Sequence, residues 1–107
     1  KMLDIKEFLE KTGMKVAENC FLKPPALPYI VFLDSASING ADDENCLSSR
    51  NIIVELYSEK INKEKEHLIE DLLNTNLLNF NKERIWIDSE GYFQTTYNFN
   101  LYEKIGG

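Results

Sequence analysis

Residues 51–58 read Asn-Ile-Ile-Val-Glu-Leu-Tyr-Ser, and this stretch decides the fold prediction. Its side chains alternate between two faces, and most are aliphatic or aromatic, which is typical of a β-strand within a sheet. The face expected to cover the core carries Ile52, Val54 and Leu56. The opposite face is mixed and carries Ile53, Glu55 and Tyr57. We therefore predict a strand from Asn51 to Ser58 with one buried face.

A second strand is predicted at Tyr29–Leu33, which is apolar on both faces. The preceding segment, Lys23–Pro28, contains three prolines. These favour an extended approach, because proline fits neither a helix interior nor a central strand. Between the strands, Asp34–Ser49 is predicted to be a long polar loop, and such loops tend to be functional. Its candidate docking residues are Asn39, Gly40, Asp42, Asp43 and Glu44. The alternative is a simple long hairpin tip.

Two helices are indicated by apolar residues at helical spacing. Asp4 is expected to cap the first helix, and Gly13 to end it in a left-handed conformation. Asn62 is expected to cap the second helix, whose apolar stripe is broad: Leu68, Ile69, Leu72, Leu73 and Leu77. Between the first helix and the prolines, Met14–Phe21 fits either a short strand or an irregular crossing.

The last unit is predicted to be a β-hairpin with the three-residue turn Ser89-Glu90-Gly91. This turn pairs Asp88 with Tyr92 and Ile87 with Phe93, which places the apolar residues of both strands on one face. It also puts Gly91 where such a loop needs a left-handed residue. The expected order is α-β-β-α-β-β. This is an α+β fold with a four-stranded, mostly antiparallel sheet and two helices packed on one face.

The length of 107 residues matches one ordinary domain, so residues 1–107 are treated as a single unit. Lys1 ahead of Met2, and the closing Gly106-Gly107 pair, resemble residues added for expression and are left out of the fold prediction. No apolar run is long enough to span a membrane, and no secretion signal is recognised, so neither membrane insertion nor secretion is expected. The two cysteines, Cys20 and Cys46, lack metal-like spacing and are expected to be reduced in the cytosol.

Composition argues against nucleic-acid recognition and against catalysis. The net charge is −6, and the lysines are interleaved with carboxylates, so sequence-specific nucleic-acid binding is not expected. His67, between Glu64 and Asp71, fits a solvated helix face better than a metal site. The sequence contains no nucleophile elbow, phosphate loop or calcium loop. We expect no enzyme activity, no cofactor and no metal.

The sheet face opposite the helices is the predicted binding surface. Strand parity gives it aromatic side chains mixed with polar ones, which is the composition of a protein–protein contact. Its members are Trp86, Tyr92, Tyr57, Ile53, Arg84 and Gln94. The alternative is that the proline-rich segment or the long loop folds back over them. If Trp86 anchors an interface, Trp86→Ala should preserve the fold and weaken assembly by about 2 kcal/mol or more.

Three parts of the sequence resemble the tail terminator, or tail completion, proteins of long-tailed phages and prophages, which act in head–tail joining. They are Pro28–Asp34, the pair Asn39–Asp42 and Asn51–Lys60, and the closing hairpin Glu83–Tyr97. The resemblance extends from about Pro28 to Tyr102, and its motifs are structural rather than catalytic. It implies a homo-oligomer, a hexameric ring, at the head-proximal end of the tail.

The same resemblance implies contacts with a tail tube protein on one side and a head connector protein on the other. DNA would pass through the ring without sequence recognition, and the long loop would be a docking element. The protein would occupy the bacterial cytoplasm during assembly and the virion tail afterwards. Two other classes remain open. One is a different head–tail adaptor or tail assembly protein, and the other is a non-phage regulatory α+β domain that binds a ligand.

Overall fold

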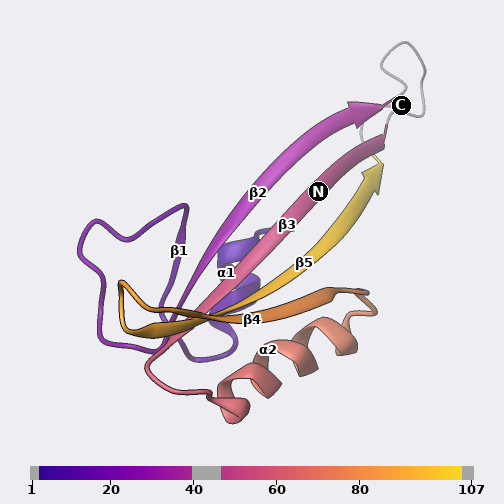
Figure 1. Cartoon of the computed structure of the whole chain (residues 1–107). Coiled ribbons are helices and arrows are strands. Elements are labelled where there is room, and N and C mark those ends of the chain that lie inside the picture. The colour runs from indigo at the N-terminus through magenta and orange to yellow at the C-terminus, as the bar shows by residue number, and fades with distance from the viewer. Residues whose placement is uncertain (1–2, 40–46, 105–107) are drawn as a thin grey trace.

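The computed structural model describes residues 3–39 and 47–104, which form a five-stranded mixed sheet and two helices (Figure 1). The elements are α1 Ile5–Glu10, β1 Val16–Glu18, β2 Tyr29–Asn39, β3 Leu47–Ser58, α2 Lys63–Thr75, β4 Asn81–Ile87 and β5 Tyr92–Lys104. The strand order across the sheet is β1-β2-β3-β5-β4. β1 runs parallel to β2, and the other neighbouring pairs are antiparallel. The α+β class is confirmed, whereas the predicted number of four strands is wrong.

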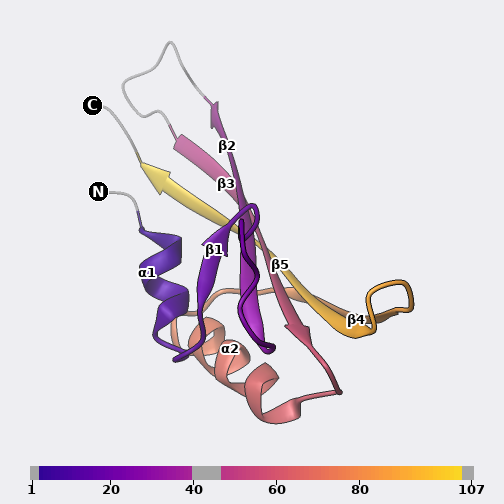
Figure 2. The ribbon, with the colours of Figure 1, turned by 90° about the vertical axis from the view of Figure 1, so that its left-hand side faces the viewer.

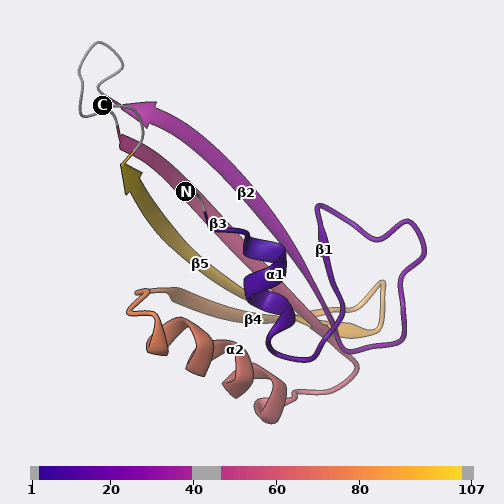
Figure 3. The same cartoon turned by 180° about the vertical axis from the view of Figure 1, so that it is seen from behind.

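Both helices lie on one face of the sheet, as predicted (Figure 3). Asp4 caps α1, where its Oδ1 accepts a hydrogen bond from the Glu7 N–H at 3.1 Å. Asn62 caps α2 in the same way and accepts from the Lys65 N–H at 3.1 Å. Gly13 follows α1 with φ +87°, which is the left-handed conformation expected for it.

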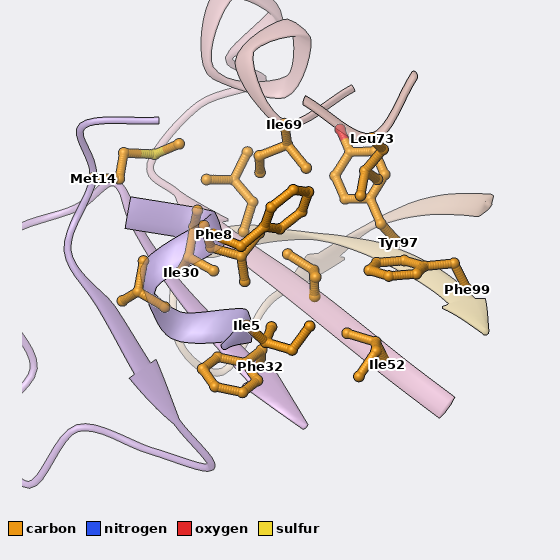
Figure 4. Close-up of a cluster of buried hydrophobic side chains, with 14 residues drawn as sticks. Ile5, Phe8, Met14, Ile30, Phe32, Ile52, Ile69, Leu73, Tyr97 and Phe99 are labelled. Atoms are coloured by element: carbon orange, nitrogen blue, oxygen red, sulfur yellow. The ribbon is translucent and has the colours of Figure 1, made fainter. Parts of the chain in front are cut away.

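The hydrophobic core lies between the two helices and the sheet (Figure 4). The helices contribute Ile5, Phe8, Leu9, Ile69 and Leu73, and the strands contribute residues such as Ile30, Ile52, Val54 and Tyr97. The stripe predicted for α2 is only partly buried. Leu72 is half-buried and Leu68 is 38% exposed, so the helix rests on the sheet along a narrow line. Leu77, predicted as part of the stripe, lies beyond the helix, which ends at Thr75, and is 89% exposed.

The additional strand is β1, within the segment that fitted either a short strand or an irregular crossing. Val16 is buried in the core opposite Ile30. The Ile30 N–H donates to the Lys15 carbonyl at 2.9 Å, and the Asn19 N–H donates to the Phe32 carbonyl at 2.9 Å. These bonds bracket a parallel pair of only three residues, which is too short for a periodic sequence pattern to reveal.

The predicted loop from Asp34 to Ser49 is wrong, because β2 continues to Asn39 and β3 begins at Leu47. Only residues 40–46 separate the two strands, and they lie outside the described residues. The chain therefore forms a long β-hairpin here, with paired strands on both sides of these residues.

β2, β3 and β5 project beyond the rest of the fold as a three-stranded extension, formed by residues 33–39, 47–53 and 99–104 (Figures 1 and 2). Paired polar side chains occur along it. Arg50 Nη2 donates to Asp34 Oδ2 at 2.6 Å, and both residues lie on the helix side. On the other side, Asn51 Nδ2 donates to Asn98 Oδ1 at 3.0 Å and to Asn100 Oδ1 at 2.9 Å. Within Asp34–Ser49, residues such as Asp34, Ser35 and Ser49 lack the apolar alternation of a strand, which is why the sequence indicated a loop.

The register predicted for the closing hairpin is also wrong. Ile87 pairs with Tyr92 and Trp86 with Phe93, so the loop has four residues, Asp88–Gly91, instead of three. Gly91 does take the left-handed conformation expected for it, with φ +73°. Its N–H donates to the Ile87 carbonyl at 2.9 Å and closes the loop.

In this register the side chains of β4 lie on the faces opposite to those predicted, because a shift of one residue moves every side chain to the other face. Arg84 and Trp86 lie on the helix side, and Ile85 and Ile87 lie on the opposite side. The cause is the partner of Arg84, a buried carboxylate at Glu66 of α2. The prediction kept the apolar residues together and did not take this ion pair into account.

Candidate functional site

The sheet face opposite the helices, here called the open face, is the candidate binding surface. It carries the odd-numbered residues of β2 and β3 and the even-numbered residues of β5. Four of the predicted interface residues lie on it: Ile53, Tyr57, Tyr92 and Gln94. All four are half-buried, so each keeps some surface for a partner.

Tyr29 of β2, Tyr57 of β3 and Tyr92 of β5 cross the open face as a continuous row, here called the tyrosine row. Adjacent ring centroids are 5.4 and 5.1 Å apart, within the range of favourable aromatic pairs. The Tyr57 hydroxyl donates to Glu55 Oε1 at 2.8 Å. Burial, followed by this hydrogen bond, raises the pKa of Tyr57, and burial followed by the charge of Glu90 raises the pKa of Tyr29 and Tyr92. The row is therefore neutral near pH 7 and suits packing rather than proton transfer.

Residues 19–28, which include the proline-rich segment, cover one end of the tyrosine row, in part as the second interpretation of the surface proposed. Phe21 packs edge-on against Tyr29 at 5.2 Å between ring centroids, and Tyr29 and Val31 are buried. A slot of about 170 Å³ remains between this segment and the row, lined in part by Pro24 and Tyr92. The cover stops there, so the β3 and β5 part of the open face stays accessible.

Two predicted interface residues, Trp86 and Arg84, are not on the open face. Trp86 packs on Phe93 with ring centroids 4.9 Å apart, and its Nε1–H donates to Asp88 Oδ1 at 3.2 Å. It is still 48% exposed, at the end of the hairpin on the helix side. Trp86 therefore remains a candidate contact residue, on a different surface from the tyrosine row.

Arg84 is engaged by Glu66, which is 1% exposed. Arg84 Nε and Nη2 donate to the two Glu66 carboxylate oxygens at 2.8 and 2.7 Å. Lys82 Nζ donates to Glu66 at 2.9 Å, and Thr95 Oγ1 donates to it at 3.1 Å. The Arg84 bonds outweigh the effect of burial and, with Lys82 and Thr95, lower the pKa of Glu66 to about 2. These four residues, here called the Glu66 cluster, tie α2 to β4 and β5.

The sequence held one signal for the Glu66 cluster. Glu66 precedes Ile69 by three residues and Leu73 by seven, which is helical spacing along the stripe that the structure buries. A carboxylate at such a position requires charged or polar partners, because an unpaired buried charge is strongly unfavourable. The cluster is a structural device, since its carboxylate oxygens are fully used within the fold.

The five candidate docking residues lie at the end of β2 or outside the described residues. Asn39 is the last residue of β2, whereas Gly40, Asp42, Asp43 and Glu44 lie outside the described residues. Within residues 3–39 and 47–104, no group of three or more His, Cys, Asp or Glu residues is arranged to hold a metal ion.

A shallow cavity of about 430 Å³ lies where β3 meets α2, lined mainly by residues 58–63. None of the helices in the described part of the chain has the length and apolar character needed to cross a membrane.

The fold is an elongated five-stranded mixed sheet with both helices on one face. A chain in the virion of a native gene transfer agent (GTA) particle shares this fold. The likeness has a TM-score of 0.61 and 10% sequence identity, and it covers 91% of this chain and 84% of that chain. At this identity the comparison shows the fold alone. No protein-family model and no curated protein matches the sequence.

Proposed function

We propose that this chain is a structural protein of a phage-like virion, and that it acts as a tail terminator, or tail completion, protein. In this role it forms a ring at the head-proximal end of the tail, between the tail tube protein and the head connector protein. The observation that carries the proposal is the fold shared with a chain of the gene transfer agent virion, because the likeness spans most of both chains. The resemblance of Pro28–Asp34, Asn51–Lys60 and the closing hairpin to tail terminators points the same way.

The surface of the protein supports a binding role. The open face combines a neutral tyrosine row with half-buried polar and aliphatic side chains, as protein–protein contacts do. Acidic residues exceed basic ones by six, so the chain has little capacity to hold phosphates by charge. An acidic ring suits DNA that must slide past it without being bound.

Assembly tests the proposal directly. Light scattering at several protein concentrations should show a defined oligomer, and negative-stain electron microscopy should show rings, either alone or on purified tail tubes. A chain that stays monomeric, does not bind tail tubes and binds a small metabolite would contradict the proposal.

Two matched variants test which surface takes part. Ile53→Arg adds a positive charge to the open face, and Leu77→Arg adds the same charge to an exposed position just beyond the C-terminal end of α2. We expect Ile53→Arg to weaken ring formation or tube binding at least tenfold, because the charge would have to be desolvated at the contact. Leu77→Arg should have little effect. Circular dichroism and thermal unfolding of both variants establish that the fold is kept.

The alternative functions predict different experimental results. A head–tail adaptor would bind the head connector without capping tail tubes, and a tail assembly protein would be absent from the mature particle. Mass spectrometry of purified particles therefore distinguishes a virion component from an assembly factor.

A further inference from the structure

The three-stranded extension has two unpaired edges. β1 pairs with β2 only at Ile30–Phe32, so within the described residues β2 has no outer partner from Leu33 to Asn39. β4 pairs with β5 only as far as Asn98, so β5 has no outer partner from Phe99 to Lys104 among those same residues. Both free edges belong to the same extension and lie on its two opposite sides (Figure 1).

The hydrogen bonds of the paired region show which backbone groups point outward. Ile30 donates to Lys15 and Phe32 accepts from Asn19, so the even-numbered residues of β2 direct their N–H and C=O groups away from β3. On the free part of the edge these are Asp34, Ala36 and Ile38. The register is continuous from β2 through β3 to β5, with no skipped residue.

The same alternation, carried across β3, assigns the outward groups of β5. Odd-numbered β5 residues bond to β3, so even-numbered residues point toward β4 or, beyond β4, to the free edge. The free edge of β5 therefore presents Asn100, Tyr102 and Lys104. Each edge offers three donors and three acceptors. Neither stretch contains proline, which proteins often use to block an edge strand.

From this geometry we infer that the free edge of β2 in one copy pairs with the free edge of β5 in the next copy. The occupant is a second copy of this chain, because the two edges have similar lengths, seven and six residues, and present the same number of outward groups. β2 and β5 both run antiparallel to β3, so copies turned about an axis along the strands would pair as parallel neighbours. The contact is head-to-tail, and a rotation that closes it generates a ring. This inference rests on the proposed function, since it specifies the contact between subunits of the proposed ring.

Electrostatic repulsion between copies opposes this contact. Each chain carries a net charge of −6, so copies repel one another at low ionic strength. The Debye length falls from about 30 Å at 0.01 M salt to about 10 Å at 0.1 M. Self-association should therefore strengthen as salt is raised, and the cross-linking below is best carried out at 0.1 M salt or above.

Disulfide cross-linking tests the pairing. In a chain with Cys20→Ser and Cys46→Ser, Ser35→Cys is combined with Asn100→Cys or with Tyr102→Cys. All three positions lie on the open face. Within one chain, Ser35 and Asn100 both flank Asn51, so they are two strand spacings, about 9.6 Å, apart. A disulfide needs Cα atoms within about 7 Å, so any bond formed must join two copies.

We expect mild oxidation of at least one double variant to give dimers and longer ladders, at least tenfold above each single variant. Ladders of this kind support the inference. Dimers from Ser35→Cys alone at the yield of the double variant would show β2 pairing with β2, and would overturn it. Absence of an interchain product from both double variants would also overturn it.

A second pair of variants separates backbone pairing from side-chain contact. Tyr102→Pro removes an outward N–H without removing a bond to β3, whereas Tyr102→Ala removes the side chain and keeps the N–H. Tyr102→Pro should weaken self-association at least tenfold relative to Tyr102→Ala, measured by sedimentation velocity. Equal behaviour of the two variants would count against a contact made by the edge backbone.

The two proposals can fail separately. Rings or tail-tube binding without the edge cross-links would overturn the pairing of β2 with β5 and leave the proposed function standing. Edge cross-links in a protein that neither forms rings nor binds tail tubes would support the pairing and overturn the proposed function.

Discussion

Replacing Glu66 by glutamine should destabilise the protein by about 3 kcal/mol near neutral pH. The carboxylate is 1% exposed and receives two hydrogen bonds from Arg84, one from Lys82 and one from Thr95. A carboxyl group whose pKa falls from 4.5 to about 2 is stabilised in its charged form by about 3 kcal/mol. Glutamine keeps the shape but removes the charge, and it leaves Arg84, in a partly buried position, without the carboxylate that accepts its hydrogen bonds. Loss of one partner from a buried ion pair typically costs about 3 to 5 kcal/mol, which agrees with this magnitude.

The same pKa predicts how the effect depends on pH. Because folding lowers the pKa of Glu66, its contribution is fully present above about pH 4.5 and is lost as the pH falls toward 2. The difference in unfolding free energy between the wild type and Glu66→Gln should therefore be constant from pH 7 to pH 5 and shrink below that. Other carboxylates titrate in both proteins, so their effects largely cancel in the difference.

Urea unfolding followed by far-ultraviolet circular dichroism at a series of pH values measures this difference. Glu64→Gln is the matched control, because Glu64 lies in the first turn of the same helix and is exposed. Its effect should stay within about 0.5 kcal/mol. For a domain of this size, 3 kcal/mol corresponds to a fall in Tm of roughly 12 °C. The reasoning fails if Glu66→Gln is as stable as Glu64→Gln, or if the difference persists unchanged at pH 2.

Three further outcomes are expected. Leu73→Ala should lower the free energy of unfolding in urea by about 3 kcal/mol, because Leu73 is fully buried. Leu77→Ala should change it by less than about 0.5 kcal/mol, because Leu77 is 89% exposed. Equal effects of the two variants would contradict the position of α2. Gly91→Ala should cost about 1 kcal/mol in the same assay, because φ is +73° and no neighbouring atom would clash, so only backbone strain acts. Burial and the hydrogen bond to Glu70 raise the pKa of Tyr97. In an ultraviolet titration, the difference in tyrosinate absorbance between the wild type and Tyr97→Phe should therefore not change around pH 10. An increase in this difference near pH 10 would refute the burial of Tyr97.

The sequence predicted the elements whose signal is local. Asp4 and Asn62 cap their helices, and Gly13 and Gly91 take positive φ, because each of these residues carries its conformational preference in its own side chain or in the lack of one. The strand at Asn51–Ser58 was predicted for a similar reason, since its alternation spans enough residues to be recognised.

Features that depend on distant partners were not predictable in the same way. The hairpin register was argued from apolar residues alone, but the pairing of Arg84 with Glu66 joins residues on β4 and α2 and fixes the opposite parity. The predicted binding surface consequently kept Tyr57 and Tyr92 but lost Trp86 to the helix side. One buried ion pair thus moved two of the predicted interface residues to the other face of the sheet.

The strand extension was missed for a related reason. Asp34, at the start of the segment predicted to be a loop, is held in β2 by pairing with β3 and by hydrogen bonds from Arg50, sixteen residues further along the chain. Local composition there is that of a loop, and only the sheet pairing shows otherwise.

The central position of β3 has a consequence for the order of folding. Its pairing with β2 closes across residues 40–46, whereas its pairing with β5 must close the 34 residues from Glu59 to Tyr92. Loop-closure entropy makes the second step cost about 3 kcal/mol and the first about 2 kcal/mol, since the cost rises with the logarithm of loop length. A chain in which β5 has not yet docked exposes the whole edge of β3, twelve residues rich in aliphatic side chains. Such an edge recruits strands from other molecules, so conditions that slow the docking of β5 should favour aggregation over folding.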